Sequence, residues 1–183
     1  MKITALLATC LLATGLVQPV QAEENFQLTV DAGHEGRLAP AHFASSFGCT
    51  GENRSPALRW SGAPAGTRSF VVTMYDPDAP TGSGWWHWVV PNLPAHVDHL
   101  PAGAGSVPGR LPAGALTVVG DSGTAGYFGS CPPVGRTHRY IFSVHALKVE
   151  KLELPPNPTP ALVGFMVWAN KLGSASMTFL GAR

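Results

Sequence analysis

The chain has few charged side chains and no clear excess of either sign. Of its 183 residues 13% are charged, with 12 lysines and arginines and 11 aspartates and glutamates. Proteins that bind DNA or RNA usually carry a basic patch that contacts the phosphates. The sequence contains no basic run that would form one, so we expect no nucleic-acid partner.

Long apolar runs are also scarce. One lies at the N-terminus, where ITALLATCLLATGLV follows Met1-Lys2 and the small residues of VQA end the segment. This layout is typical of a secretory signal peptide and is short for a membrane span. We expect residues 1–22 to be removed by cleavage after Ala22. Residues 23–183 would then be one periplasmic or secreted domain without a transmembrane segment.

Cysteine is rare, with three in the chain. Cys10 would allow a lipoprotein cut, but Thr9 is a poor residue before such a cut and the apolar stretch ahead of it is short. Export would leave Cys49 and Cys131, and an even count in an exported protein favours a disulfide bond. Sequence alone does not show that the two meet, and two buried free thiols are the alternative.

Glycine and proline are abundant, at 21 and 17 residues, and they divide the chain into short segments. This punctuation indicates strands and turns rather than a helical bundle. Four segments have the composition or alternation of strands, at residues 26–30, 69–76, 87–93 and 139–147. Pro91 would place the third of these at a sheet edge or a bulge. The sequence therefore predicts a mainly β fold of the sandwich type.

One segment near the C-terminus has the signals of a helix. Thr159 suits the N-cap, Pro160 the first helical position and Lys171 the last turn, and Gly173 would end the helix. The face expected to pack on the core consists of Leu162, Phe165, Met166 and Ala169, which share helical spacing.

Residues 101–130 contain neither strand nor helix signals. The pentapeptide LPAGA occurs twice, at residues 100–104 and 111–115. Two copies are too few for a solenoid, which needs at least three stacked repeats. We interpret this region as a long, turn-rich excursion, a kind of segment that is usually functional or mobile.

Two aspartates lie in the run DPDAP. Pro77 and Pro80 exclude a helix there and bias the preceding residues toward extended conformations. Alternate residues of an extended segment point to the same side, so Asp76 and Asp78 could face one cleft. The alternative is an ordinary turn in which both carboxylates accept hydrogen bonds from nearby backbone N–H groups.

Aromatic and histidine side chains follow at short range. In WWHWVV, His87 lies among three tryptophans, and an imidazole near acids can bind an anion when protonated or act as a general base when neutral. Two further candidates lie in the later segment GYFGSCPPVGRTHRY. Gly129 would let the backbone approach a ligand closely, and Pro132 would stiffen the wall of the pocket. His138 and Tyr140 follow, two residues apart, so they share one side of a strand.

Taken in order, DPDAP, WWHWVV and GSCPPVGRTHRY resemble the phosphatidylethanolamine-binding protein family, also called the Raf kinase inhibitor protein family. Residues 47–70 and 161–172 are similar to its exported bacterial branch, and the likeness covers nearly the whole mature chain. The resemblance implies an antiparallel β-sandwich with few peripheral helices, one of them near the C-terminus. It also implies a small pocket for phosphate-type anions or phosphoryl head groups.

The family pocket maps onto matching positions of this chain. The ligand-binding residues that the resemblance implies are Asp76, Trp85, His87, His138 and Tyr140, with Pro132 in the wall; Asp78 and Gly129 are further candidates. It also implies a cis peptide bond before Pro80. A disulfide between the two remaining cysteines would lie beside this pocket.

Three departures from the family pattern concern the same region. Many relatives have two adjacent histidines where this chain has Trp86-His87. Cys131 occupies a position that is often glycine in eukaryotic members. The C-terminal region that lies over the pocket in eukaryotic members has no match in MTFLGAR, residues 177–183.

We expect the phosphate to be held by hydrogen-bond donors. Protonated His87 or His138, the Tyr140 hydroxyl and loop N–H groups could supply them. Asp76 would accept a hydrogen bond from an imidazole, raising its pKa and fixing its tautomer. Trp85 would form an apolar floor.

Parts of the sequence are also compatible with functions other than phosphate binding. A hydrolase could use the Asp and His side chains, but no serine lies in a G-x-S-x-G pattern, and Cys131 is expected to be oxidised. The motif HVDH, residues 96–99, has metal-ligand spacing but fits a polar turn better. A protein partner, such as a peptidase that the protein inhibits or a signalling protein, is a further possibility. We expect no catalytic residue, no metal and no cofactor.

Overall fold

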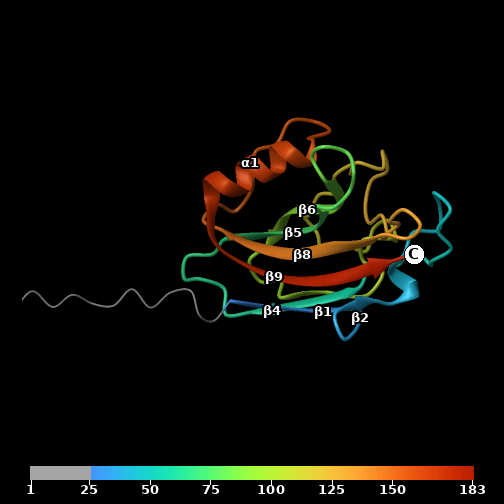
Figure 1. Cartoon of the computed structure of the whole chain (residues 1–183). Helices are drawn as coiled ribbons and strands as arrows, with labels where there is room; N and C mark the ends of the chain where they lie inside the picture. The colour runs from blue at the N-terminus through green and yellow to red at the C-terminus, as the bar shows by residue number, and fades with distance from the viewer. Residues whose placement is uncertain (1–25) are drawn as a thin grey trace, which may run out of the picture.

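The computed structural model describes residues 26–183 (Figure 1), so the expected signal peptide and its cleavage site lie outside the described residues. The strands are β1 (Gln27–Asp31), β2 (Gly33–His34), β3 (Arg37–Leu38), β4 (Ala57–Ser61), β5 (Ser69–Asp76), β6 (Trp85–Pro94), β7 (His99–Leu100), β8 (Thr137–Leu147) and β9 (Lys171–Ala182). The helices are the short 3-10 helix η1 (Pro40–His42) and α1 (Pro160–Asn170). The prediction of a mainly β chain with a helix near the C-terminus is confirmed.

The strands form two sheets. One has the order β1-β4-β7, and the other has the order β2-β3-β9-β8-β5-β6. Strand β3 pairs with β9 in parallel, and the other strand pairs are antiparallel. All four predicted strand segments are strands, and β6, which contains Pro91, is the edge strand that this proline indicated.

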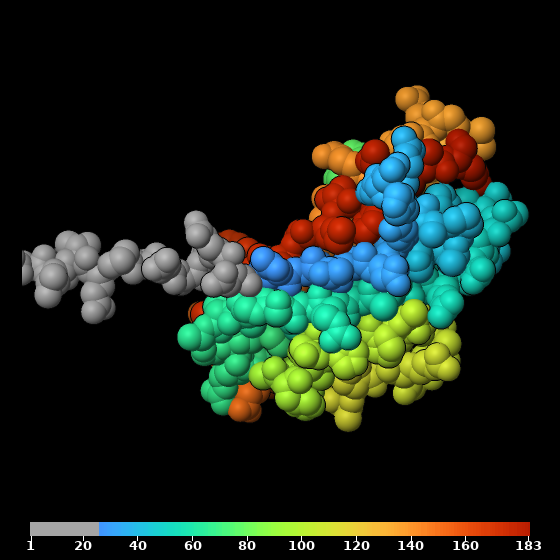
Figure 2. Space-filling view, turned by 90° about the horizontal axis from the view of Figure 1, so that it is seen from below, coloured from blue at the N-terminus to red at the C-terminus, as the bar shows by residue number. Residues whose placement is uncertain are grey.

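The main core lies between the two sheets. Side chains of both sheets form one buried cluster, and the rings of Trp60 on β4 and Phe70 on β5 meet across it at 5.4 Å. Trp88, Tyr140 and Phe142 are fully buried there. Figure 2 shows the outside of the smaller sheet, where β1 (blue) lies beside β4 (teal). Burial of aromatic and branched side chains between two sheets is the main stabilisation of such a fold.

A second apolar cluster lies on the outer face of the six-stranded sheet. There Val163 and Val167 of α1 pack against Val71, Val89 and Leu147 of the sheet. Helix α1 thus covers one end of this face, above β5, β6 and β8 (Figure 1). No helix within residues 26–183 has the length and apolar character needed to cross a membrane.

The predicted end of α1 and most of its predicted core face are wrong, although its start is confirmed and Met166 of that face packs against the second cluster. The Thr159 hydroxyl accepts a hydrogen bond from the Leu162 N–H, as an N-cap does. The helix ends at Asn170, and Lys171 begins β9 directly. The buried residues are Pro160, Val163 and Val167, whereas Phe165 is 60% exposed. Helix α1 contains no charged residue to mark its outer side, so several apolar stripes were equally plausible.

The excursion between β7 and β8 contains turns and isolated bridges within the described chain, one of them between Val119 and Ala125. It stays close to the sheet because Leu116 N–H donates to the Pro91 carbonyl and Phe128 N–H donates to the His87 carbonyl. This long segment therefore runs along the edge strand β6. It also forms one wall of the region where the end of β5 meets the starts of β6 and β8.

Candidate functional site

Three strand ends meet at one end of the large sheet. Strand β5 ends at Asp76, which pairs with Trp85 at the start of β6, and Tyr75 pairs with Ile141 near the start of β8. Antiparallel pairing thus brings DPDAP and the tryptophan-rich segment that follows it together with the His138 segment, which lies about 50 residues further along the sequence. This explains why the three motifs carry one site.

A cavity of about 230 Å³ lies at these strand ends. Five of the residues implied by the family resemblance line it: Asp76, Trp85, His87, His138 and Tyr140. The remaining lining residues are Phe47, Ala79, Pro80, Thr81, Phe128, Cys131 and Pro133. The cavity is therefore largely aromatic, with one carboxylate and two imidazoles.

Asp76 and His138 form a buried pair. His138 Nδ1 lies 2.7 Å from Asp76 Oδ2, and the two side chains are 7% and 4% exposed. The other carboxylate oxygen accepts a hydrogen bond from the Asp78 N–H at 2.8 Å. The prediction that Asp76 accepts a hydrogen bond from an imidazole is confirmed. Because a carboxylate only accepts, Nδ1 carries the hydrogen and Nε2 is left for a ligand.

His87 is buried and held by the backbone. Its Nδ1 lies 2.9 Å from the Phe128 carbonyl oxygen, so Nδ1 carries the hydrogen there as well. Burial lowers the pKa of His87 to about 4, although the Phe128 carbonyl and Asp76 oppose the shift. The ring is therefore mostly neutral above pH 5, which favours the neutral form of His87 over the protonated form. Its Nε2 is an acceptor, not a donor, at those pH values.

Two donors of the cavity wall have no well-placed partner. Within residues 26–183, Trp85 Nε1 is buried without a hydrogen bond. Tyr140 Oη is buried without a hydrogen bond of good geometry, but it lies close to the Asp76 carboxylate and the Cys131 backbone, and both act on its pKa. Burial, together with the nearby negative charge of Asp76, raises the pKa of Tyr140 above its usual value, so this hydroxyl keeps its proton. A buried donor without an acceptor costs roughly 1–3 kcal/mol. A ligand oxygen that reached these groups would remove part of that cost.

Asp78 does not line the cavity. Its Oδ2 accepts hydrogen bonds from Arg139 N and Nε, and its Oδ1 accepts one from Nη2 at 2.6 Å. The hydrogen bonds from Arg139 lower the pKa of Asp78 to about 2. Strand β5 ends at Asp76 and a turn follows, so the extended alternation stops before Asp78. The expectation that both carboxylates face one cleft is therefore wrong.

Gly129 and Pro132 lie outside the lining. A Cβ on Gly129 would come within 2.4 Å of Ala44 N and 2.7 Å of the His42 carbonyl oxygen, so this glycine admits another backbone segment. Pro132 is buried, and its neighbour Pro133 lines the cavity instead. The expected cis bond before Pro80 is also absent, because residues 26–183 contain no cis peptide bond.

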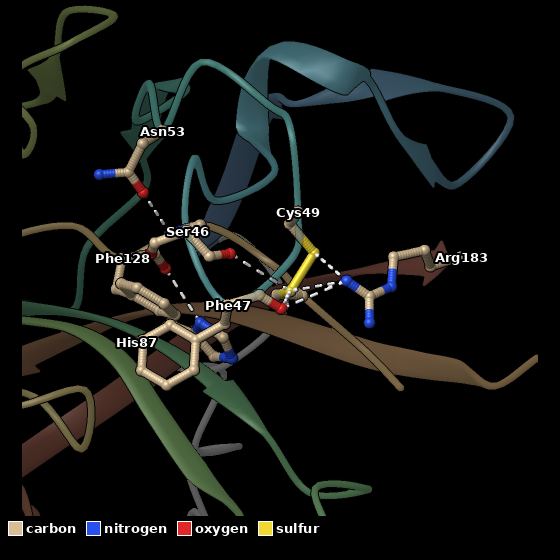
Figure 3. The surroundings of a disulfide bond; sticks show 9 residues. Ser46, Phe47, Cys49, Asn53, His87, Phe128 and Arg183 are labelled. Carbon is tan, nitrogen blue, oxygen red and sulfur yellow. Dashed lines mark hydrogen bonds between the residues drawn. A yellow bond between two sulfur atoms is a disulfide. The ribbon is translucent and has the colours of Figure 1, made fainter. Parts of the chain in front are cut away.

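A disulfide lies at the rim of the cavity, and Figure 3 shows the residues around it. Cys49 and Cys131 are bonded, with their Cα atoms 5.8 Å apart, so the predicted disulfide is confirmed. Cys131 itself lines the cavity. The bond fixes the loop that precedes Cys49 against the wall formed by the double proline.

Phe47 and Phe128 are lining residues that we did not predict. Phe47 lies on the disulfide-bonded loop with a φ of 55°, is 70% exposed, and its ring meets that of Phe128 edge-on at 5.5 Å. Phe128 in turn stacks on the His87 ring at 5.9 Å. The Arg183 guanidinium donates to the Phe47 carbonyl at 3.4 Å (Figure 3). The nearness of Phe47 to Cys49 in the sequence was the one signal that could have placed it here.

The HVDH motif forms no metal centre in the structure. His99 Nδ1 lies 2.7 Å from the adjacent Asp98 carboxylate, which is exposed, and this contact lowers the pKa of Asp98. Across residues 26–183 there is no group of three His, Cys, Asp or Glu side chains that could hold a metal ion.

The chain is similar in sequence and in fold to proteins of a described family. The family profile "Phosphatidylethanolamine-binding protein" matches residues 30–181. The chain is 53% identical over 156 residues to the UPF0098 protein YbcL of Escherichia coli, covering 84% of this chain and 85% of the relative. The crystal structure of E. coli YbcL, "a new member of the mammalian PEBP family", has a TM-score of 0.83 at 50% identity and covers 87% of this chain and 99% of that one.

Two further proteins show a more distant likeness, one in sequence and one in fold. The putative lipoprotein LppC of Mycobacterium tuberculosis is 35% identical over 142 residues, covering 77% of this chain and 64% of the relative. A phosphatidylethanolamine-binding protein from Plasmodium vivax has the same fold, with a TM-score of 0.53 at 15% identity over 89% of this chain and 88% of that one.

Proposed function

Because this chain belongs to the phosphatidylethanolamine-binding protein family, we propose that its cavity binds small phosphate-type anions or phosphoryl head groups. The observation that supports this most directly is the pair of donors in the cavity wall, Trp85 Nε1 and Tyr140 Oη, that lack a hydrogen bond of good geometry. Oxyanions accept such hydrogen bonds, and bonds to a charged acceptor are the strong ones.

The histidines suggest which phosphoryl groups fit best. Neutral His87 offers Nε2 as a hydrogen-bond acceptor. The oxygens of a fully deprotonated phosphate are also acceptors, so they would repel Nε2 instead of forming a hydrogen bond with it. A phosphate monoester with one proton can donate that proton to Nε2 and accept hydrogen bonds from Trp85 and Tyr140. The ligand would therefore be a monoanion with an acidic O–H group.

This chemistry predicts a dependence on pH. Phosphate monoesters lose their second proton near pH 6. Phosphorylethanolamine should bind at pH 5 and weaken roughly tenfold for each pH unit above that pKa. The measurement is an NMR titration of the oxidised protein that follows the His87 and His138 ring resonances between pH 5 and 8.

A matched ligand separates the proposal from simple anion binding. The sulfate ester 2-aminoethyl sulfate has the shape of phosphorylethanolamine but carries no proton at these pH values. It should bind weakly between pH 5 and 8 and gain affinity only near pH 4, where His87 becomes a donor. Equal binding of the two esters at pH 5, or an affinity for phosphorylethanolamine that is flat from pH 5 to 8, would contradict the proposal.

We propose that the protein acts outside the cytoplasm. A disulfide persists in an oxidising compartment, and one relative is named a lipoprotein. Mass spectrometry of the protein recovered from the periplasm or medium of its host would test this, together with cleavage after Ala22. Recovery from the cytoplasm alone, with intact residues 1–22, would oppose it.

A role as modulator of another protein is the second candidate. Two large apolar side chains are 70% and 78% exposed: Phe47, which lines the cavity, and Val134, which follows the lining residue Pro133 in the sequence. Exposed apolar groups beside a ligand pocket suit a partner that senses its occupancy. Inhibition of a peptidase that is lost with Phe47→Ser would support this role, and inhibition unchanged by that variant would argue against this surface.

A hydrolase has less support from the lining. The Cys131 sulfur is in the disulfide, and the Thr81 hydroxyl donates to the Gly84 carbonyl. A nucleophile needs a base within hydrogen-bonding reach, and neither of these groups is placed for it. We therefore propose binding rather than catalysis.

A further inference from the structure

A second cavity, of about 210 Å³, lies between α1 and the outer face of the six-stranded sheet. It is separate from the strand-end cavity and shares no lining residue with it. Its floor includes Thr73, Val89 and His145 from three neighbouring strands, and α1 forms its roof. The volume equals roughly seven water molecules at about 30 Å³ each, which is room for a small organic molecule.

Gly164 keeps this space open. It lies in the interior of α1 and lines the cavity, and a Cβ added to it would meet no atom within 4 Å. Glycine inside a helix costs roughly 0.5–1 kcal/mol relative to alanine. No close approach of another segment requires a glycine at this position. The helix thus leaves open space that the Cβ of a larger residue could enter without a clash.

Two indole rings line the same space. Trp86 is fixed on the sheet, because its ring lies 4.6 Å from that of Tyr75 and its backbone N–H donates to the Asp121 carboxylate. Trp168 extends from α1, is 75% exposed, and has its ring 6.0 Å from that of Phe165. Aromatic side chains on the two sides of a cavity suit a flat apolar ligand.

The lining has one positive charge and no carboxylate. Lys171, the first residue of β9, lies at the exposed edge of the cavity. It forms no ion pair within residues 26–183. His145 is half-buried and shares a hydrogen bond with the Ser174 hydroxyl at 2.7 Å, and partial desolvation, with the charge of Lys171, lowers its pKa. Lys171 therefore supplies the only formal charge that the lining carries at pH 7.

We propose that this cavity is a binding site for small aromatic carboxylates. The ring lies between Trp86 and Trp168, and the carboxylate meets the Lys171 ammonium group at the open edge. This site is independent of the phosphoryl site proposed above and differs from it in charge, because a cation rather than a set of neutral donors receives the anion.

The test uses three ligands that share a ring and differ in charge: benzoate, benzyl alcohol and benzylamine. The indole N–H resonances of Trp86 and Trp168 are followed by NMR at pH 7. Benzoate should shift both resonances saturably, with an affinity up to roughly fivefold higher than that of benzyl alcohol, as an exposed ion pair allows. Benzylamine should bind most weakly. Equal affinity of all three ligands would overturn the proposal.

Two variants and one control complete the design. Lys171→Met should abolish the preference for benzoate over benzyl alcohol, whereas Lys151→Met, which changes an exposed lysine outside the lining, should keep it. Gly164→Met fills the cavity with a good helix former and should remove benzoate binding from a folded protein. Retained benzoate binding in Gly164→Met would overturn the proposal. So would shifts at the His87 and His138 rings while both indoles stay unchanged.

Discussion

Two acid–base pairs lie next to each other where β5 ends and β8 begins, and they differ chiefly in burial. The side chains of Asp76 and His138 are 4% and 7% exposed, whereas those of Asp78 and Arg139 are 28% and 55% exposed. In the outer pair, the carboxylate and the guanidinium bind each other through several hydrogen bonds. In the inner pair, one imidazole nitrogen is left at the cavity wall. The same kind of pairing thus serves a turn at the surface and a ligand site beneath it.

Removing the acid of the inner pair should have the largest effect. Asp76→Ala leaves the Asp78 N–H and the buried His138 ring without their acceptor. A buried hydrogen-bond donor left without its acceptor costs roughly 1–3 kcal/mol. Urea unfolding at pH 7 should show a loss of that size. A loss below about 1 kcal/mol would mean that the buried inner pair contributes no more to the free energy of unfolding than the exposed outer pair.

Removing one donor beside the inner pair should change binding without lowering stability. Tyr140→Phe deletes a hydroxyl that has no hydrogen bond of good geometry among the described residues, so the free energy of unfolding should stay equal or rise slightly. Phosphorylethanolamine should bind roughly 10- to 100-fold more weakly at pH 5, since hydrogen bonds to charged groups contribute about 1.5–3 kcal/mol.

The matched control is Tyr75→Phe. The Tyr75 hydroxyl donates to the Ser83 carbonyl and lies outside the strand-end cavity. This variant should leave the affinity for phosphorylethanolamine unchanged. An equal loss of affinity in both variants would point to a general change of the fold and would remove Tyr140 from the proposed site.

Breaking the outer pair should have the smallest effect. Asp78→Asn should cost at most about 1 kcal/mol at pH 7, because exposed ion pairs contribute little. The folded-state pKa of Asp78 is depressed from 3.8 to about 2. Its contribution is therefore present above pH 4 and is lost as the pH falls through about 2. Urea unfolding of wild type and variant should differ at pH 7 and converge at pH 2; a difference that grows on acidification would contradict this.

Much of the fold follows from local patterns. The alternation of residues 139–147 predicts β8, and the segment that ends at Asp76 predicts β5 without error in its bounds. The N-cap Thr159 marks the start of α1, since capping depends only on nearby residues. Compartment and parity predicted that Cys49 and Cys131 would be bonded. Each of these inferences depends on neighbours in the chain or on a simple count.

The remaining features depend on packing across the fold. Whether Asp78 faces the cavity is decided by Arg139, a partner 61 residues away. The neutral state of His87 results from burial under Phe128 and Tyr140, and no local motif reports burial. Which face of α1 is buried depends on how the helix packs on the six-stranded sheet. Motifs thus predicted which residues meet, but not which of them keep a free nitrogen or oxygen for a ligand.

The disulfide at the cavity rim has a consequence for how the protein matures. It closes a loop with a sequence separation of 82, to which the chain-entropy model assigns roughly 4.5 kcal/mol as an upper value. Typical domains have only about 5–15 kcal/mol of net stability. A newly made chain in a reducing compartment would lack this contribution and stay easier to unfold, and a chain that reached an oxidising one would gain it on arrival. Under the export proposed above, the binding site would therefore reach its full stability only after the chain is oxidised.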